Sequence, residues 1–266
     1  MSRVAEAFAK AAAENRAALV GYLPAGFPTQ QGGIDALTAM VRAGVDVVEV
    51  GLPYSDPVLD GPTIQQAADQ ALAGGTRIAD VLATVEAVAA TGAATVVMTY
   101  WNPVLRYGAE RFAADLAAAG GAGLITPDLT PDSGADWLAA SDARDLDRIF
   151  LVAPSSTPER IALTVAACRG FVYATAVMGV TGARSQTSVA APPLVARIRE
   201  ATDLPIGVGL GVSNGIQAAE VAGYADGVIV GSAFVRQLLD APDLAAGVAG
   251  CADLAADLAA GVRSRS

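Results

Sequence analysis

The 266-residue chain contains no histidine and only one lysine, Lys10. The first absence removes the commonest metal ligand and the commonest general base in proteins. Lys10 lies in a helical pattern close to the N-terminus, so a covalent Schiff base or a covalently held pyridoxal phosphate would depend on a poorly placed side chain. Any catalysis by this chain is therefore expected to use other groups.

Cysteines, long apolar runs and positive charge are also scarce. Cys168 and Cys251 each lie among small apolar residues at helical spacing, and we expect packed thiols rather than a disulfide. No apolar run reaches the roughly 20 residues of a membrane helix without an interrupting Gly, Pro, Asp or Arg, and the charged start is unlike a signal peptide. The net charge of −10 disfavours nucleic acid and anionic membranes as partners. The expected location is cytoplasmic.

Strand-like runs alternate with Ala-rich amphipathic segments along the whole chain. This alternation predicts right-handed βα units and a parallel sheet, and eight such units favour a closed (β/α)8 TIM barrel. We expect one domain over residues 1–266, with an additional N-terminal helix over 1–16, a short extra helix after strand 8 and a last outer helix over 243–262. The predicted strands are Ala18–Leu23, Val45–Val50, Thr95–Tyr100, Gly123–Thr126, Arg148–Val152, Phe171–Thr175, Ile206–Val208 and Gly227–Val230.

Two carboxylates mark the stretch between residues 47 and 64. Glu49 lies inside an apolar, β-branched run, and Asp60 follows in a loop that three prolines stiffen. A buried carboxylate is costly unless it is paired or used. The pairing alternative is an ion pair with Arg148, but that arginine starts a strand, whereas the chemistry of such barrels lies at the strands' carboxyl ends. We therefore expect Glu49 and Asp60 to perform proton transfer.

Glycines after the last two predicted strands indicate a phosphate site. The segment 207–215 reads Gly-x-Gly-x-Gly and opens a helix, and Gly231 and Ser232 follow the next strand. Glycine lets backbone N–H groups approach an anion closely, and the loops after strands 7 and 8 are the recurrent phosphate position of barrels. The alternative is that these are ordinary tight βα turns.

Other residues at strand ends could complete a pocket. Tyr22, Tyr100 and Tyr173 could line it for a flat, apolar ring, although tyrosines at strand ends are often packing residues. The small, polar, glycine-containing segment 178–188 has the composition of a closing lid or of an ordinary loop.

At this point the chain resembles the α subunit of tryptophan synthase. The match is in register over essentially the whole length, and its most specific part surrounds the two acids. One departure is Asp128-Leu-Thr130-Pro131, where that family usually has proline directly after Asp-Leu. The matching segments are Glu49-Val-Gly-Leu-Pro-Tyr-Ser-Asp56-Pro-Val-Leu-Asp60-Gly-Pro-Thr-Ile-Gln, Met98-Thr-Tyr100-Trp-Asn102-Pro, Tyr173 to Gly182, Gly209-Leu-Gly211-Val and Gly231-Ser232.

The resemblance implies retro-aldol cleavage of indole-3-glycerol phosphate to indole and glyceraldehyde 3-phosphate. It implies that Glu49 protonates the indole ring carbon and handles the glycerol hydroxyl proton, that Asp60 holds the indole N–H, and that Tyr173 supports the pocket. Asp56 and Asn102 are implied to face a β subunit in an α2β2 complex, with no cofactor in this chain and pyridoxal phosphate in the partner. The implied substrate-binding residues are Tyr22, Met98, Tyr100, Thr126, Thr181, Gly182, Gly211, Gly231 and Ser232.

The composition supports a lyase of this kind. Aldol cleavage commonly uses a lysine imine or a bound metal, and this sequence favours neither. The leaving carbon would then be stabilised by protonation of the substrate, which an indole permits. Two enzymatic alternatives remain open, a stand-alone indole-releasing lyase and a phosphosugar isomerase on the same barrel, and a third is a non-catalytic subunit that activates a partner.

Overall fold

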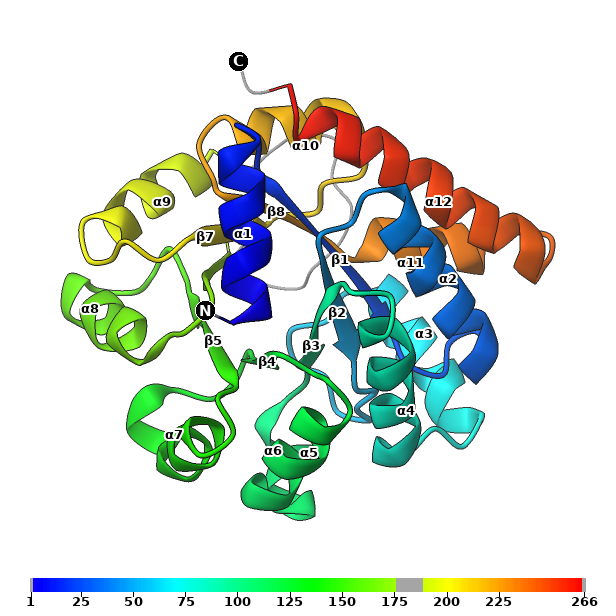
Figure 1. The fold of residues 1–266 in the computed structure, drawn as a ribbon, viewed down its shortest axis with the longest axis horizontal. Coiled ribbons are helices and arrows are strands. Elements are labelled where there is room, and N and C mark those ends of the chain that lie inside the picture. The colour runs from blue at the N-terminus through cyan, green and yellow to red at the C-terminus, as the bar shows by residue number, and fades with distance from the viewer. Residues whose placement is uncertain (1, 176–188, 265–266) are drawn as a thin grey trace.

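The computed structural model describes residues 2–175 and 189–264 and shows a closed barrel of eight parallel strands in chain order (Figure 1). This confirms the predicted (β/α)8 TIM barrel. All strand bounds agree with the sequence prediction to within two residues. The strands are β1 (Ala18–Pro24), β2 (Val47–Gly51), β3 (Ala94–Met98), β4 (Gly123–Thr126), β5 (Asp147–Val152), β6 (Val172–Thr175), β7 (Ile206–Gly209) and β8 (Gly227–Val230).

Helices surround the barrel, and three strands are followed by an additional helix before the outer one. The additional helices are α3 (Pro62–Ala73) after β2, α5 (Trp101–Tyr107) after β3 and α11 (Ser232–Leu239) after β8. The last of these is the short extra helix predicted after strand 8. The remaining elements are α1 (Arg3–Ala13), α2 (Gln30–Ala43), α4 (Ile78–Ala89), α6 (Ala109–Ala118), η1 (Pro131–Ser133), α7 (Ala135–Asp142), α8 (Pro158–Ala167), α9 (Ala191–Arg199), α10 (Gly215–Ala222) and α12 (Leu244–Gly261).

Local sequence explains where these elements begin and end. The side chain of Thr29 accepts the Gly32 N–H at the start of α2, and Gly44 ends that helix with a φ of 121°, a region that favours glycine. Thr157 caps α8, and Pro158 occupies its first turn. All five residues of β2 are buried, as expected for a parallel strand covered on both faces.

The strand predicted over Thr95–Tyr100 ends two residues earlier than expected, because β3 runs from Ala94 to Met98. Tyr100 instead caps α5, and the Asp128 carboxylate accepts the N–H of Trp101 at 2.8 Å. The chain therefore turns away from the barrel wall immediately after β3, which decides where the Tyr100 side chain lies.

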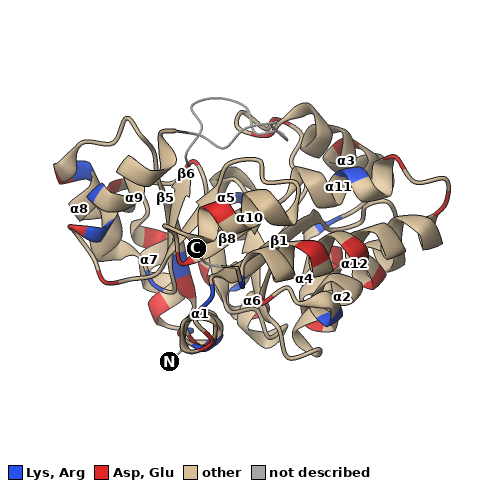
Figure 2. Ribbon diagram, turned by 90° about the horizontal axis from the view of Figure 1, so that it is seen from above, with Lys and Arg blue, Asp and Glu red and all other residues tan. Residues whose placement is uncertain are grey.

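Helix α1 closes the amino end of the barrel. It lies across the middle of the strands in Figure 1 and below them in Figure 2. Its Phe8 packs against Phe171 with ring centroids 5.1 Å apart, within a buried cluster of interior side chains such as Val20, Val47 and Val96. Because these side chains fill the amino half of the barrel interior, any open space in the interior lies in its carboxyl half.

Charged residues are prominent on the outer helices and loops in Figure 2. Among the described residues, α12 alone is long and apolar enough for a membrane span by length and composition, although two aspartates interrupt its sequence. In the structure it is the last outer helix of the barrel, packed on α2, α10 and α11. One of its aspartates, Asp257, accepts the Gly215 N–H at 2.6 Å and so attaches α12 to the start of α10.

Candidate active site

A cavity of about 440 Å³ lies at the carboxyl ends of the strands. Its wall is largely apolar, and both predicted acids are part of it. The lining residues are Tyr22, Glu49, Leu59, Asp60, Ile64, Met98, Pro127, Leu151, Ala153, Ser156, Tyr173, Thr175, Gly209, Leu210, Gly211, Ile229, Gly231 and Ser232.

Glu49 is the central residue of β2, and the neighbouring strands on both sides hold its backbone in place. On β2 it is paired with Tyr22 of β1 on one side and Val96 of β3 on the other. The residue is 0% exposed, and neither carboxyl oxygen has a hydrogen-bond partner among the described residues. Burial raises the pKa of Glu49 to about 8. At neutral pH this side chain is therefore mainly a neutral carboxylic acid that can donate a proton into the cavity.

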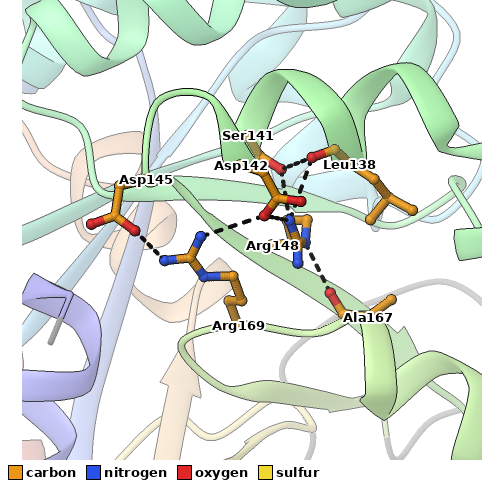
Figure 3. Close-up of polar contacts among 7 residues, drawn as sticks. All are labelled: Leu138, Ser141, Asp142, Asp145, Arg148, Ala167 and Arg169. Carbon is orange, nitrogen blue, oxygen red and sulfur yellow. Dashed lines mark hydrogen bonds and ion pairs between the residues drawn. The ribbon is translucent and has the colours of Figure 1, made fainter.

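The alternative of an ion pair between Glu49 and Arg148 does not hold in this structure. Ile149, the next residue of β5, belongs to the interior cluster, so the Arg148 side chain faces the outer helices, where it lies beside Ser141 and Asp142 (Figure 3). Its guanidinium forms an ion pair with Asp142 and donates hydrogen bonds to the carbonyl oxygens of Leu138 and Ala167. Arg148 therefore joins α7 to the start of β5 and the end of α8, and Glu49 stays available for chemistry.

Asp60 approaches the cavity from the loop between β2 and α3. The Leu59 N–H, one residue before it, donates to the Tyr100 hydroxyl at 2.9 Å, and Gln65 Nε2 donates to the Asp60 carbonyl oxygen at 2.8 Å. Burial raises the pKa of the Asp60 carboxyl to about 6. At neutral pH Asp60 is thus mainly ionised while Glu49 is mainly neutral. Two carboxyls whose environments separate their pKa values are the usual arrangement of an acid–base pair.

Two of the three predicted tyrosines line the cavity. Burial, followed by the charges of both acids, raises the pKa of Tyr22 and of Tyr173 well above the usual range, so both hydroxyls stay protonated. Glycines make room for their rings: a Cβ on Gly51 would lie 2.4 Å from the Tyr22 hydroxyl, and one on Gly209 would lie 2.5 Å from that of Tyr173. Neither site tolerates a larger residue without displacing its tyrosine.

Tyr100 and Thr126, both predicted to contact the substrate, are buried but do not line the cavity. The Tyr100 hydroxyl instead contacts the loop that carries Asp60, through the Leu59 N–H. Thr126 follows Ile125, which belongs to the interior cluster, and successive residues of a strand face opposite sides. The Thr126 side chain therefore faces the outer helices. Met98, the third residue predicted for this region, does line the cavity.

The predicted phosphate residues form another part of the cavity wall. Gly211, Gly231 and Ser232 all line it. Gly211 has a φ of +82°, a conformation that favours glycine, and α11 begins at Ser232, so its first N–H groups have no carbonyl partner within the helix. Such a helix start attracts anions. The predicted residues Thr181 and Gly182, and the whole of the predicted lid over 178–188, lie outside the described residues.

Several lining residues were not singled out from the sequence as substrate contacts. Leu151, Thr175 and Ile229 each lie near the carboxyl end of a strand, on the face that points inward. The two-residue period of the strands could have identified them. Ser156 could not have been found in this way, because a turn after β5 brings it to the cavity; its hydroxyl accepts the Ala153 N–H at 3.2 Å.

The residues predicted to face a partner lie outside the cavity. Asp56 and Asn102 are both exposed; Asp56 accepts a hydrogen bond from the Ser55 hydroxyl, and Asn102 donates one to the Tyr54 hydroxyl at 3.3 Å. Within the described ranges no group of three acidic or cysteine side chains could hold a metal ion. The residues present thus form a neutral acid, an ionised acid and a glycine-rich anion site around one apolar cavity.

The chain is similar throughout its length to one protein family. The family model described as tryptophan synthase alpha chain matches residues 8–260. The tryptophan synthase alpha chain of Salinispora arenicola is 67% identical over 264 residues, which is 99% of each chain. A solved structure of Mycobacterium tuberculosis tryptophan synthase superposes with a TM-score of 0.93 at 59% identity over 98% of each chain. The alpha subunit from Legionella pneumophila, only 29% identical, gives a TM-score of 0.87 over 98% of each chain.

Proposed function

The chain belongs to the tryptophan synthase alpha chain family, and from this premise we propose that Glu49 and Asp60 together perform the acid–base chemistry of its reaction. As the alpha subunit it cleaves indole-3-glycerol phosphate to indole and glyceraldehyde 3-phosphate and works with a β subunit. The alpha chains of this family carry no cofactor, and pyridoxal phosphate is bound by the β subunit. The family match decides against the phosphosugar isomerase. A stand-alone lyase would release indole at the full rate without a β subunit, so the assay without the partner distinguishes it.

The different protonation states of the two acids carry the proposal. Glu49, neutral below a pH of about 8, donates its proton to C3 of the indole ring, which leaves a positive charge on the ring nitrogen. The Asp60 carboxylate accepts a hydrogen bond from the ring N–H and stabilises this cation. Both groups line the same cavity, and among the described residues no other acidic side chain does so.

The second half of the reaction returns Glu49 to its starting state. Its carboxylate removes the proton from the hydroxyl on the carbon attached to C3. The electron pair of the carbon–carbon bond returns to the ring and neutralises the nitrogen, while the alkoxide oxygen forms the aldehyde. Indole and glyceraldehyde 3-phosphate result, and Glu49 is protonated again. One buried carboxyl thus performs both proton transfers without net exchange with solvent.

The remaining lining residues fit the two ends of the substrate. We assign the phosphate to the N–H groups of Gly211, Gly231 and Ser232, together with the Ser232 hydroxyl, because the helix start at Ser232 supplies unpaired donors. We assign the indole ring to the apolar wall formed by Tyr22, Met98 and residues near them, with Tyr173 supporting the ring beside Glu49.

The pH dependence of kcat/KM tests the assignment of the acids. As pH rises through about 8, Glu49 ionises and can no longer protonate C3, so activity falls about tenfold for each pH unit. As pH falls through about 6, Asp60 becomes protonated and the cation loses its counter-charge, so activity falls again. Initial rates of indole release from pH 5 to 10, with the β subunit present, should give a bell-shaped profile.

The substrate phosphate also titrates near pH 6. The inhibition constant of glycerol phosphate, measured at each pH, corrects for this contribution. A rate that stays constant up to pH 10 would show that Glu49 is not the proton donor.

We propose that the β subunit contacts the surface formed by the β2–α3 loop and α5. Asp56 and Asn102 lie on this surface, and two exposed apolar side chains accompany them, Val58 at 72% and Leu105 at 53% exposure. Exposed apolar residues among polar ones are typical of protein interfaces. The unusual segment Asp128–Pro131 adjoins the same surface, because Asp128 accepts the Trp101 N–H at the start of α5.

We also propose one domain and a cytoplasmic location. Helices from both ends of the chain pack on the same barrel, α1 on β1 and β3 and α12 on α2. Cys168 and Cys251 are both free and buried, and burial raises the pKa of their thiols to about 11 and about 12. Unpaired thiols of this kind suit a reducing compartment.

A further inference from the structure

The peptide segment around Asp60 is held from two sides. Between residues 53 and 60 the loop makes no backbone–backbone hydrogen bond to any residue that the structure describes beyond it. Two side chains supply such contacts instead. The Tyr100 hydroxyl accepts the Leu59 N–H at 2.9 Å, and Gln65 Nε2 donates to the Asp60 carbonyl oxygen at 2.8 Å. These two hydrogen bonds enclose the residue whose carboxylate points into the cavity.

Tyr100 is itself fixed by its surroundings. It is the N-cap residue of α5, and the Asp128 carboxylate holds the N–H of the next residue, Trp101. Its ring packs on that of Tyr54, with centroids 5.2 Å apart, so the loop rests on it at a second point. Tyr100 is buried yet absent from the cavity wall. Its hydroxyl is thus placed to support the loop rather than to contact a ligand.

Gln65 acts from the other side of the loop. It lies in the first turn of α3, and its own N–H donates to the Gly61 carbonyl at 2.9 Å, within the helix start. Because α3 is a regular helix packed against β1 and α11, the Gln65 side chain links the loop to a rigid element. It too lies outside the cavity wall.

We propose that Tyr100 and Gln65 are positioning residues for Asp60, and that they act on catalysis only through its carboxylate. The inference rests on the role proposed above for Asp60 in stabilising the ring cation. That cation exists only after C3 has been protonated, so misplacing Asp60 weakens an interaction of the transition state rather than of the bound substrate. Loss of either hydrogen bond should therefore lower kcat and leave KM nearly unchanged.

Tyr100→Phe and Gln65→Met test the inference, because each removes the hydrogen bond and keeps most of the side-chain volume. One lost hydrogen bond corresponds to a roughly fivefold to tenfold fall in kcat. The matched controls are Tyr224→Phe, which removes a tyrosine hydroxyl in the turn between α10 and β8, and Gln66→Met on the exposed face of α3. Both controls should keep kcat within about twofold of the wild type, since a typical surface change has little effect.

A double-mutant cycle distinguishes a positioning role from a merely structural one, because it measures whether the effect on kcat depends on the Asp60 carboxylate. Each substitution is also made in the Asp60→Asn background, and kcat for indole release is measured for all variants in complex with the β subunit. If Tyr100 and Gln65 act through Asp60, their substitutions change kcat by less than about twofold in that background, because coupled residues are not additive. Circular dichroism and thermal melting confirm that each variant is folded.

The possible outcomes are distinct. If the Asp60→Asn variant is slow but the single variant Tyr100→Phe keeps the wild-type rate, the inference is overturned and the proposed function stands. The same holds if Tyr100→Phe lowers kcat by an equal factor with and without the Asp60 carboxylate. An Asp60→Asn variant at the wild-type rate would overturn the proposed function, and this inference with it.

Discussion

Glu49→Gln is expected to abolish indole release, with a loss in kcat of about a thousandfold or more. The substitution keeps the shape of the side chain but leaves no proton that can be donated to C3 and no base that can take one from the glycerol hydroxyl. Because the same carboxyl performs both transfers, neither half of the reaction has a substitute within the described cavity wall. Indole formation from indole-3-glycerol phosphate, with and without the β subunit, measures the effect.

Binding should survive this substitution. The phosphate site lies at Gly211, Gly231 and Ser232, on other strands, so calorimetry should find the affinity for glycerol phosphate changed by less than about twofold. Glu86→Gln, on the exposed face of α4, is the matched control and should retain the full rate. Turnover by Glu49→Gln within tenfold of the wild type would remove Glu49 from the mechanism.

The same variant should be more stable than the wild type at alkaline pH. Since the pKa of Glu49 is about 8 in the folded chain against 4.5 in an open chain, the folded state binds more protons between these values, and stability falls as pH rises through this window. Above pH 8 the buried charge costs roughly 3 to 5 kcal/mol, which glutamine avoids. Urea unfolding at pH 5 and pH 9 should show a stabilising effect at pH 9 only. A site selected for chemistry can carry such a cost.

Asp60→Asn should lower kcat by about a hundredfold to a thousandfold. Asparagine can still accept a hydrogen bond from the ring N–H, but it has no negative charge to stabilise the cation that follows protonation. The interaction is lost mainly in the transition state, so KM should change little. Steady-state kinetics of the α–β complex separate these two constants.

Asp69→Asn is the matched control, because this exposed carboxylate lies on α3 only nine residues further along. It should leave both constants within about twofold. If Asp60→Asn raises KM and keeps kcat, Asp60 merely orients the ring, and the cation must be stabilised by another group.

Much of the fold could be predicted because parallel strands buried on both faces have a simple pattern. Segments such as Val47–Gly51 are short, apolar and β-branched, and amphipathic helices separate them. The difference at β3 has a local cause: α5 begins at Trp101 because Asp128, 27 residues away, holds its N–H. The order of apolar and polar residues along the sequence does not predict this contact.

The two acids could be found for the same reason that they are reactive. A carboxylate inside an apolar strand contradicts its surroundings, and the absence of histidine left few other groups for proton transfer. Tyr100 was harder to assign, because its role depends on a hydrogen bond to Leu59, 41 residues earlier. The family resemblance implies that Thr126 binds the substrate, but its neighbour Ile125 faces the barrel interior. Since adjacent residues of a strand face opposite sides, the Thr126 side chain faces outward.

The protonation state of Glu49 in the free enzyme is the most decisive property to measure, because the proposed proton transfer begins from a neutral carboxyl. Infrared difference spectra between the wild type and Glu49→Gln, recorded with 13C-labelled glutamate from pH 5 to 10, isolate the carboxyl band of this one residue. We expect a protonated carboxyl at pH 7 whose band disappears with a midpoint near pH 8. A side chain that is fully ionised at pH 7, with a midpoint near the ordinary glutamate value, would contradict this expectation.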